Sequence, residues 1–157
     1  MTRLSYRTSP VEHVVLRDGV VVVAVDDEQR VALIRHTAPL HGEMLSVPGG
    51  MVEEGETSRA AAERELAEET GLSAADWERV GEFVPVPYST QRLSIFLATG
   101  LVCGTPHLEA HEIDAGFRLE WWPLVDALGR VRDGEVRLSG SALALLLVTE
   151  RLGQVAS

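Results

Sequence analysis

Short runs of β-branched and aliphatic residues, separated by polar turns, make up the first third of the chain. Val11–Leu16 and Gly19–Val25 lie on either side of Arg17-Asp18, and an Asp-Gly step between such runs is typical of a β-hairpin. We therefore expect these two runs to pair with each other. Further strands are predicted at 31–34 and 44–47, with a loop over 37–43 between them.

The hydrophobic pattern becomes helical after Pro48-Gly49-Gly50. Thr57 or Ser58 can cap a helix N-terminus, and Gly71 is well suited to end the same helix. The residues between them are rich in alanine, leucine and glutamate, which favour helix formation. We expect one helix here, and the spacing of its glutamates places Glu65, Glu68 and Glu69 on one face.

The second half of the chain alternates again between strands and helices. Pro123 stands where a helix can begin, with apolar residues at helical spacing after it, and Ser139 or Ser141 can cap a last helix reaching about Leu152. Strands are predicted at 79–84, 93–102 and 117–122, a connection at 73–78, and a long loop at 104–116. The pattern alone predicts a single domain of mixed α and β structure.

Negative charge is concentrated in the predicted helix and the turn before it. Seven glutamates and two arginines between Glu53 and Glu69 account for half of the chain's formal charge of −10. Like charges repel, so crowded carboxylates are costly unless a cation offsets them. Three carboxylates on one helical turn form an oxygen site suited to Mg²⁺ or Mn²⁺. The alternative is a solvated acidic face, which is common on surface helices.

The spacing of the fixed residues decides between these interpretations. The order is Gly50, Glu56, Arg64-Glu65-Leu66, Glu68-Glu69 and Gly71-Leu72, with five, seven, one and one residues in the gaps. This 23-residue pattern, residues 50–72, resembles the Nudix box of the Nudix hydrolases. The resemblance implies a Nudix fold, an α/β/α sandwich of the α+β type with a central catalytic helix. It also implies metal-dependent hydrolysis of a nucleoside diphosphate derivative.

The resemblance suggests roles for the acidic residues of the box. Glu65 and Glu69 are expected to bind the metal, with Glu68 as a further ligand or as the base that orients water. The carbonyl of Gly49 can join the metal shell. Glu56 either reaches the same cluster or interacts favourably with the helix dipole from the first turn.

Two further charged residues are candidates for the chemistry. Arg64 is assigned an orienting ion pair with a glutamate, the alternative being a rim salt bridge of little energetic value. Glu112, with Glu109 as second choice, is our candidate general base from the acidic loop, because related enzymes take that base from a late loop. For either residue alone, a solvated loop charge is the alternative.

Pro87 lies fifteen residues beyond Leu72, as in the ADP-ribose pyrophosphatases of this family. The resemblance predicts cleavage of ADP-ribose to AMP and ribose 5-phosphate; another nucleotide-sugar or a nucleoside triphosphate is the alternative. Tyr88 either stacks on a base or packs over its loop. Those enzymes usually carry Gln-x-Arg after the strand ending near Ile34, where this chain has His36-Thr37-Ala38. Arg35 either substitutes as a substrate contact or is a solvated charge.

Composition limits the partners and the compartment. A net charge of −10 argues against nucleic acids and anionic membranes as partners. The single cysteine, Cys103, is expected to be a small buried hydrophobic residue, and a cytoplasmic location is expected. We expect one domain over 1–157, with 1–19 as an N-terminal strand or extension, and a homodimer is plausible. His36 and His111 are expected to face solvent, and Trp121 and Trp122 to face opposite sides of a strand.

Overall fold

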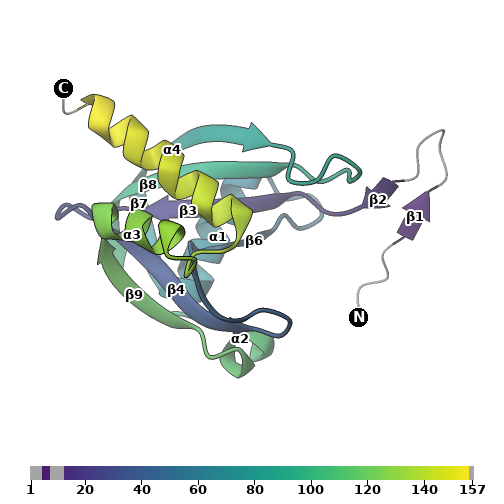
Figure 1. Ribbon diagram of the computed structural model, residues 1–157, viewed down its shortest axis with the longest axis horizontal. Coiled ribbons are helices and arrows are strands. Elements are labelled where there is room, and N and C mark those ends of the chain that lie inside the picture. The colour runs from purple at the N-terminus through teal and green to yellow at the C-terminus, as the bar shows by residue number, and fades with distance from the viewer. Residues whose placement is uncertain (1–4, 8–12, 156–157) are drawn as a thin grey trace.

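A central β-structure is covered on one side by α1 and on the other by α3 and α4 (Figure 1). The computed structural model describes residues 5–7 and 13–155. The strands are β1 (Ser5–Arg7), β2 (His13–Val15), β3 (Gly19–Ala24), β4 (Arg30–Ala38), β5 (Gly42–Ser46), β6 (Gly49–Met51), β7 (Leu72–Phe83), β8 (Leu93–Cys103) and β9 (Arg118–Pro123). The helices are α1 (Ser58–Thr70), α2 (Ala110–Asp114), α3 (Leu124–Arg132) and α4 (Ser139–Val155). This arrangement confirms the expected mixed sandwich.

The strand β3 lies between two hydrophobic cores, one on each of its faces. Its side chains alternate between the two faces, as the pleat of a strand requires. Val20 and Val22 pack with Leu66 of α1 in one buried cluster. Val23 packs with Leu145 of α4 in the other. A nearly continuous apolar run is what a strand buried on both faces needs.

The described residues form three sheets, and two of these build the body of the molecule. The four-stranded sheet has the order β6-β3-β8-β7, and the three-stranded sheet has the order β5-β4-β9. Within the four-stranded sheet β3 and β8 run parallel, while their outer neighbours are antiparallel to them. A bridge between Val25 and Val31 joins β3 to β4. Strands β1 and β2 form a separate two-stranded sheet beside the body (Figure 1).

The predicted hairpin between Val11–Leu16 and Gly19–Val25 is wrong. In the described residues β2 pairs with β1, and β3 pairs with β6 and β8; Val11 and Glu12 lie outside the described residues. The Asp18 turn is held by other segments instead, because its carbonyl accepts the Val52 N–H at 2.8 Å. Local turn chemistry was outweighed by long-range pairing, since both edges of β3 were already taken.

Two predicted irregular segments are strands. Residues 73–78, expected to be a connection, belong to β7, which runs from Leu72 to Phe83 along β8. They carry Asp76 and Glu78 because β7 is an edge strand with much of its length exposed. The loop expected over 37–43 is shorter, since β4 continues to Ala38 and β5 begins at Gly42. Cys103 ends β8 and is exposed, so its expected burial is also wrong.

The helix α1 begins and ends where the sequence predicts. Thr57 is the N-cap, and its hydroxyl accepts the Ala60 N–H at 3.1 Å. Gly71 is the C-cap with φ of 73°, a left-handed conformation that glycine adopts without strain. The start of α3 after Pro123 is confirmed as well. Helix α4 already includes both Ser139 and Ser141, and the Ser141 hydroxyl accepts the Val47 N–H at 3.2 Å, so the predicted capping role of these serines is not confirmed. None of the helices in the described residues is long and apolar enough to cross a membrane.

Candidate metal centre

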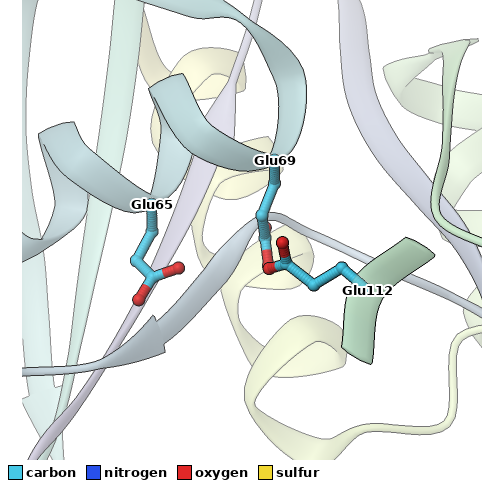
Figure 2. Close-up of side chains that lie close together, drawn as sticks. All are labelled: Glu65, Glu69 and Glu112. Atoms are coloured by element: carbon cyan, nitrogen blue, oxygen red, sulfur yellow. The ribbon is translucent and has the colours of Figure 1, made fainter. Parts of the chain in front are cut away.

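Three buried carboxylates meet at one end of the sandwich. Glu65 and Glu69 lie on successive turns of α1, and Glu112 enters from α2 with its carboxylate directed at Glu69 (Figure 2). One oxygen from each residue lies within 4.8 Å of the others. All three side chains are buried, with at most 8% of each residue exposed. Hard oxygen ligands at this separation match the coordination that Mg²⁺ and Mn²⁺ favour.

Burial makes the metal-free cluster electrostatically unfavourable. Burial, together with the nearby charges of Glu65 and Glu112, raises the pKa of Glu69 to about 9, although the hydrogen bond from the Gly49 N–H opposes this rise. Burial also raises the pKa of Glu65, in part offset by Arg64. With this pKa, Glu69 holds a proton near neutral pH unless a cation replaces it. The residues therefore fit a divalent ion by the chemistry of their own donor set.

Arg64 links the box together. Its Nε and Nη2 donate to Glu56 at 3.0 and 3.1 Å, and its Nη1 donates to Glu65 at 2.8 Å and to Glu68 at 3.1 Å. A fourth partner is the Met51 carbonyl, at 3.0 Å from Nη2. The bidentate pair with Arg64 lowers the pKa of Glu56. This engagement places Glu56 beside Arg64 rather than in the buried cluster.

The glycine loop shapes the cluster from the other side. The Gly49 N–H donates to Glu69 Oε2 at 3.0 Å, so in this structure Gly49 contacts the cluster through its N–H. A Cβ at Gly50 would stand 2.2 Å from Glu65 Oε1 and 2.4 Å from Glu65 Cδ. Contacts this short do not occur, so either the Glu65 carboxylate or the loop would have to shift if Gly50 carried a side chain. The glycine thus leaves the space that the Glu65 carboxylate occupies.

Glu112 is positioned by the short helix α2, which lies within the loop predicted at 104–116. Its Oε2 accepts the Glu109 N–H at 2.6 Å, an arrangement typical of a capping box. The Thr37 N–H donates to the Ala115 carbonyl at 2.9 Å and ties this segment to β4. Glu112 is thus held at the cluster and is not a solvated loop charge.

A cavity of about 320 Å³ opens over the cluster. Its acidic lining residues are Glu53, Glu65, Glu68, Glu69, Glu109 and Glu112. Arg17 and Arg64 are the arginines in its wall. Arg64 is engaged by three glutamates and the Met51 carbonyl, whereas the Arg17 side chain forms no ion pair in the part of the chain that the structure describes. Sequence reasoning missed Arg17 because it stands in a turn rather than in a motif.

The structure places the predicted substrate contacts away from this cavity. Arg35 is paired with Glu120 at 2.6 Å and with Glu43 and Glu135 at 3.3 Å each, so it is neither solvated nor free for substrate. Pro87 and Tyr88 are exposed and do not belong to the lining described above. Two of the three carboxylates that hold Arg35, those of Glu120 and Glu135, lie 85 and 100 residues away along the chain, so no local pattern indicates them.

Two predictions about ring side chains have different outcomes. His36, expected to face solvent, is half-buried; its Nε2 lies 3.1 Å from Ser46 Oγ and its ring 5.0 Å from that of Phe117. Burial lowers the pKa of His36. His111 is exposed, as expected. Trp121 packs with the α1 cluster and Trp122 with the α4 cluster, which confirms that they face opposite sides.

Comparison with known proteins accounts for this arrangement. The sequence model of the NUDIX domain matches residues 15–139, most of the chain. The chain belongs to the Nudix family. Nudix hydrolases generally need a divalent metal ion, and the buried glutamates provide a cluster for one.

Two curated relatives share a name. The chain is 33% identical to an ADP-ribose pyrophosphatase of Mycobacterium tuberculosis H37Rv over 134 residues, which cover 83% of this chain and 64% of that protein. It is 31% identical to an ADP-ribose pyrophosphatase of Bacillus subtilis over 129 residues, which cover 81% of this chain and 69% of that protein. This Nudix chain thus spans slightly less than two thirds of the mycobacterial relative.

Solved structures support the same fold. A crystal structure of an ADP compounds hydrolase superposes on this Nudix chain with a TM-score of 0.79 and 26% identity, covering 92% of this chain and 78% of that one. The expected Nudix fold is therefore confirmed. The individual roles assigned to the glutamates, Arg64 and Gly49 stay predictions.

The raised pKa of Glu69 predicts how the metal-free protein responds to pH. With a folded pKa of about 9 against 4.5 for the free side chain, the folded state holds a proton that the unfolded state has lost. Glu69 therefore does not destabilise the fold below about pH 4.5, and its effect lowers the free energy of unfolding as the pH rises from about 4.5 to about 9. We expect the melting temperature in chelator to fall over that range more steeply for the wild type than for Glu69→Gln. Equal slopes for the two proteins would contradict this.

Proposed function

We propose that the chain is a divalent-metal-dependent hydrolase that cleaves ADP-ribose to AMP and ribose 5-phosphate. The observation that carries this proposal is the buried Glu65–Glu69–Glu112 cluster at the floor of a cavity in a Nudix domain. Buried carboxylates without a cation are unfavourable, and a bound ion that neutralises them can also face the phosphate oxygens of a substrate. We infer one Nudix domain for the folded body.

Different residues of the chain would bind the ion and orient the reactants. Glu65, Glu69 and Glu112 would hold the metal, which supplies a bound water of lowered pKa and neutralises phosphate charge. Glu112 has one oxygen fixed by the Glu109 N–H, which suits a ligand better than a mobile general base. Glu68 is less buried, lines the cavity and lies 3.1 Å from Arg64. This position suits the residue that orients the attacking water.

Arg64 acts through its neighbours. Its hydrogen bonds to Glu65 and Glu68 fix the direction of both carboxylates and keep the Glu65 charge partly compensated. Gly49 fixes Glu69 in the same way through its N–H. Arg17 stands at the rim of the cavity, where a guanidinium can meet a phosphate oxygen.

The choice of ADP-ribose and of the ion rests on similarity and donor chemistry. Two relatives of this chain are named ADP-ribose pyrophosphatase, and a structural neighbour is an ADP compounds hydrolase. An oxygen-only cluster favours Mg²⁺ or Mn²⁺ over ions that prefer nitrogen or sulfur. Arg35, Pro87 and Tyr88 are left out of the proposed mechanism, because none of them lines the cavity over the glutamate cluster. The homodimer and the cytoplasmic location stay predictions.

A substrate panel tests this proposal. The purified chain is incubated with Mg²⁺ and, separately, ADP-ribose, other nucleoside diphosphate sugars and nucleoside triphosphates, and the products are identified by mass. We expect AMP and ribose 5-phosphate from ADP-ribose, and no turnover in chelator. Release of pyrophosphate from a triphosphate with ADP-ribose untouched would select a different Nudix reaction. No turnover of any compound with Mg²⁺ or Mn²⁺ would reject hydrolysis altogether.

A further inference from the structure

The chain that follows β8 crosses the C-terminal end of α1 before it reaches α2. Residues 104–107 form this crossing segment, and all four of them are exposed. The Gly104 N–H donates to the Gly71 carbonyl at 2.7 Å, and the His107 N–H donates to the Glu68 carbonyl at 2.8 Å. An exposed segment gains little from hydrophobic burial, so its position on α1 depends on these backbone contacts.

The close approach of the two backbones depends on a glycine on each side. A Cβ on Gly71 would stand 2.7 Å from the Gly104 carbonyl oxygen, and a Cβ on Gly104 would stand 2.8 Å from the Gly71 carbonyl oxygen. Ordinary contacts between carbon and oxygen are about 3.3 Å or longer. Gly71 also has a left-handed φ of 73°, whereas Gly104 does not have a positive φ. At Gly104, therefore, the short contact alone disfavours a side chain.

The crossing segment contacts the helix that carries two of the buried glutamates. The last carbonyls of a helix have no hydrogen-bond partner within that helix. In α1 the Glu68 carbonyl receives its donor from the crossing segment, one residue before the buried Glu69. The segment thus caps α1 next to residues of the proposed metal centre.

The same stretch of chain leads to the third carboxylate of the cluster. Only Leu108 separates the crossing segment from Glu109, whose N–H donates to Glu112 Oε2 at 2.6 Å. Glu112 then extends from α2 toward Glu69 (Figure 2). The position of the crossing segment on α1 therefore determines where Glu112 meets the carboxylates of that helix.

We propose that Gly104 is a positioning residue for the metal centre, because it lets the crossing segment lie close enough to α1 for Glu112 to complete the cluster. A side chain at this position would move the segment away from Gly71, and Glu112 would move away from Glu69 with it. Changing a group that orients a metal ligand typically weakens metal binding by about 10- to 100-fold. This inference rests on the proposed function, since it concerns the ion that the three glutamates would hold.

The test measures Mn²⁺ affinity instead of turnover. Binding is followed by the electron paramagnetic resonance signal of free Mn²⁺, well below the melting temperature, for the wild type, Gly104→Ala, Glu112→Gln and the double variant. We expect Gly104→Ala to weaken Mn²⁺ binding at least about tenfold in the wild-type background. In the Glu112→Gln background the same change should weaken binding less than about threefold, because the carboxylate that it displaces is already absent.

Thr105→Ala is the matched control within the crossing segment. It shortens an exposed side chain and adds no atom between the two backbones, so Mn²⁺ affinity should equal that of the wild type. If Gly104→Ala does not fold, Gly71→Ala places a methyl group in the same contact from the helix side and should weaken binding at least about tenfold. Gly134→Ala is the control for that variant, because Gly134 has a similar φ of 79° but nothing within 4 Å of its Cβ position.

The outcomes separate this inference from the proposed function. Wild-type Mn²⁺ affinity in Gly104→Ala would overturn it, and so would an equal loss in both backgrounds, because the effect would then not depend on Glu112. Absence of Mn²⁺ binding to the wild type would overturn the inference together with the proposed function. The expected affinities without any turnover of ADP-ribose would reject the proposed substrate but support the role of Gly104.

Discussion

Replacing Glu69 with glutamine is expected to abolish most of the activity while making the metal-free protein more stable. The side chain keeps its shape and can still accept the Gly49 N–H, but it no longer offers a charged oxygen to an ion. Even the outer partners of metal ligands typically contribute about 10- to 100-fold, so we expect turnover to fall at least about 100-fold. The measurement is ADP-ribose turnover at saturating Mg²⁺.

The same substitution is expected to raise the stability of the metal-free protein. Glu69 is buried beside two other carboxylates and its pKa is raised to about 9, so ionising it costs folding free energy in the absence of a cation. Glutamine removes that cost, and the melting temperature in chelator should rise at about pH 8. The rise produced by Mn²⁺ should shrink at the same time.

Glu63→Gln is the matched control for Glu69→Gln. Glu63 lies on the same helix but is exposed and paired with Arg59 at 2.6 Å. An exposed pair of this kind contributes about 0–1 kcal/mol, so both turnover and the Mn²⁺ response should stay near the wild-type values. Glu69→Gln behaving like Glu63→Gln would remove Glu69 from the proposed metal centre.

The Gly50→Ala substitution is expected to lower the turnover rate although it replaces no charged residue. The new Cβ would stand 2.2 Å from Glu65 Oε1, so the carboxylate must move by about an ångström or the β6 loop must shift. A misplacement of about 1 Å can cost about 100-fold in rate, and we expect a loss between tenfold and about 100-fold for Gly50→Ala. Turnover and the Mn²⁺ response are measured together.

The control for this change is a glycine with open space around it. A Cβ at Gly129, inside α3, meets nothing within 4 Å, so Gly129→Ala should keep full activity and gain up to about 1 kcal/mol of stability. Wild-type turnover in Gly50→Ala would show that Glu65 can be displaced freely, and would weaken its assignment as a ligand.

The catalytic helix could be predicted from sequence because its signals are local. Thr57, Gly71 and the spacing of Glu65 and Glu69 all lie within one short segment, and capping and helical periodicity act over such distances. The strand β3 was predicted from its local run of valines, although its pairing partners were not. In both cases neighbours along the chain determine the structure.

The rest depended on contacts between distant residues. Glu112 reaches Glu69 only because β8 and α2 bring it back to the helix, and no spacing rule links the two. The first half of β7, residues 72–78, was missed because an edge strand tolerates residues such as Asp76 that resemble a turn. Arg35 looked like a free strand-end charge, but its partners Glu120 and Glu135 lie 85 and 100 residues away.

The five-residue helix α2 supplies one of the three acidic side chains to the cluster. A backbone hydrogen bond from the Thr37 N–H to the Ala115 carbonyl joins the C-terminal end of this helix to β4. A segment this short can open by itself while both hydrophobic clusters remain packed. The affinity for the ion and the free energy of that opening are then thermodynamically linked. A substitution that loosens α2 would weaken metal binding without lowering the global stability of the fold.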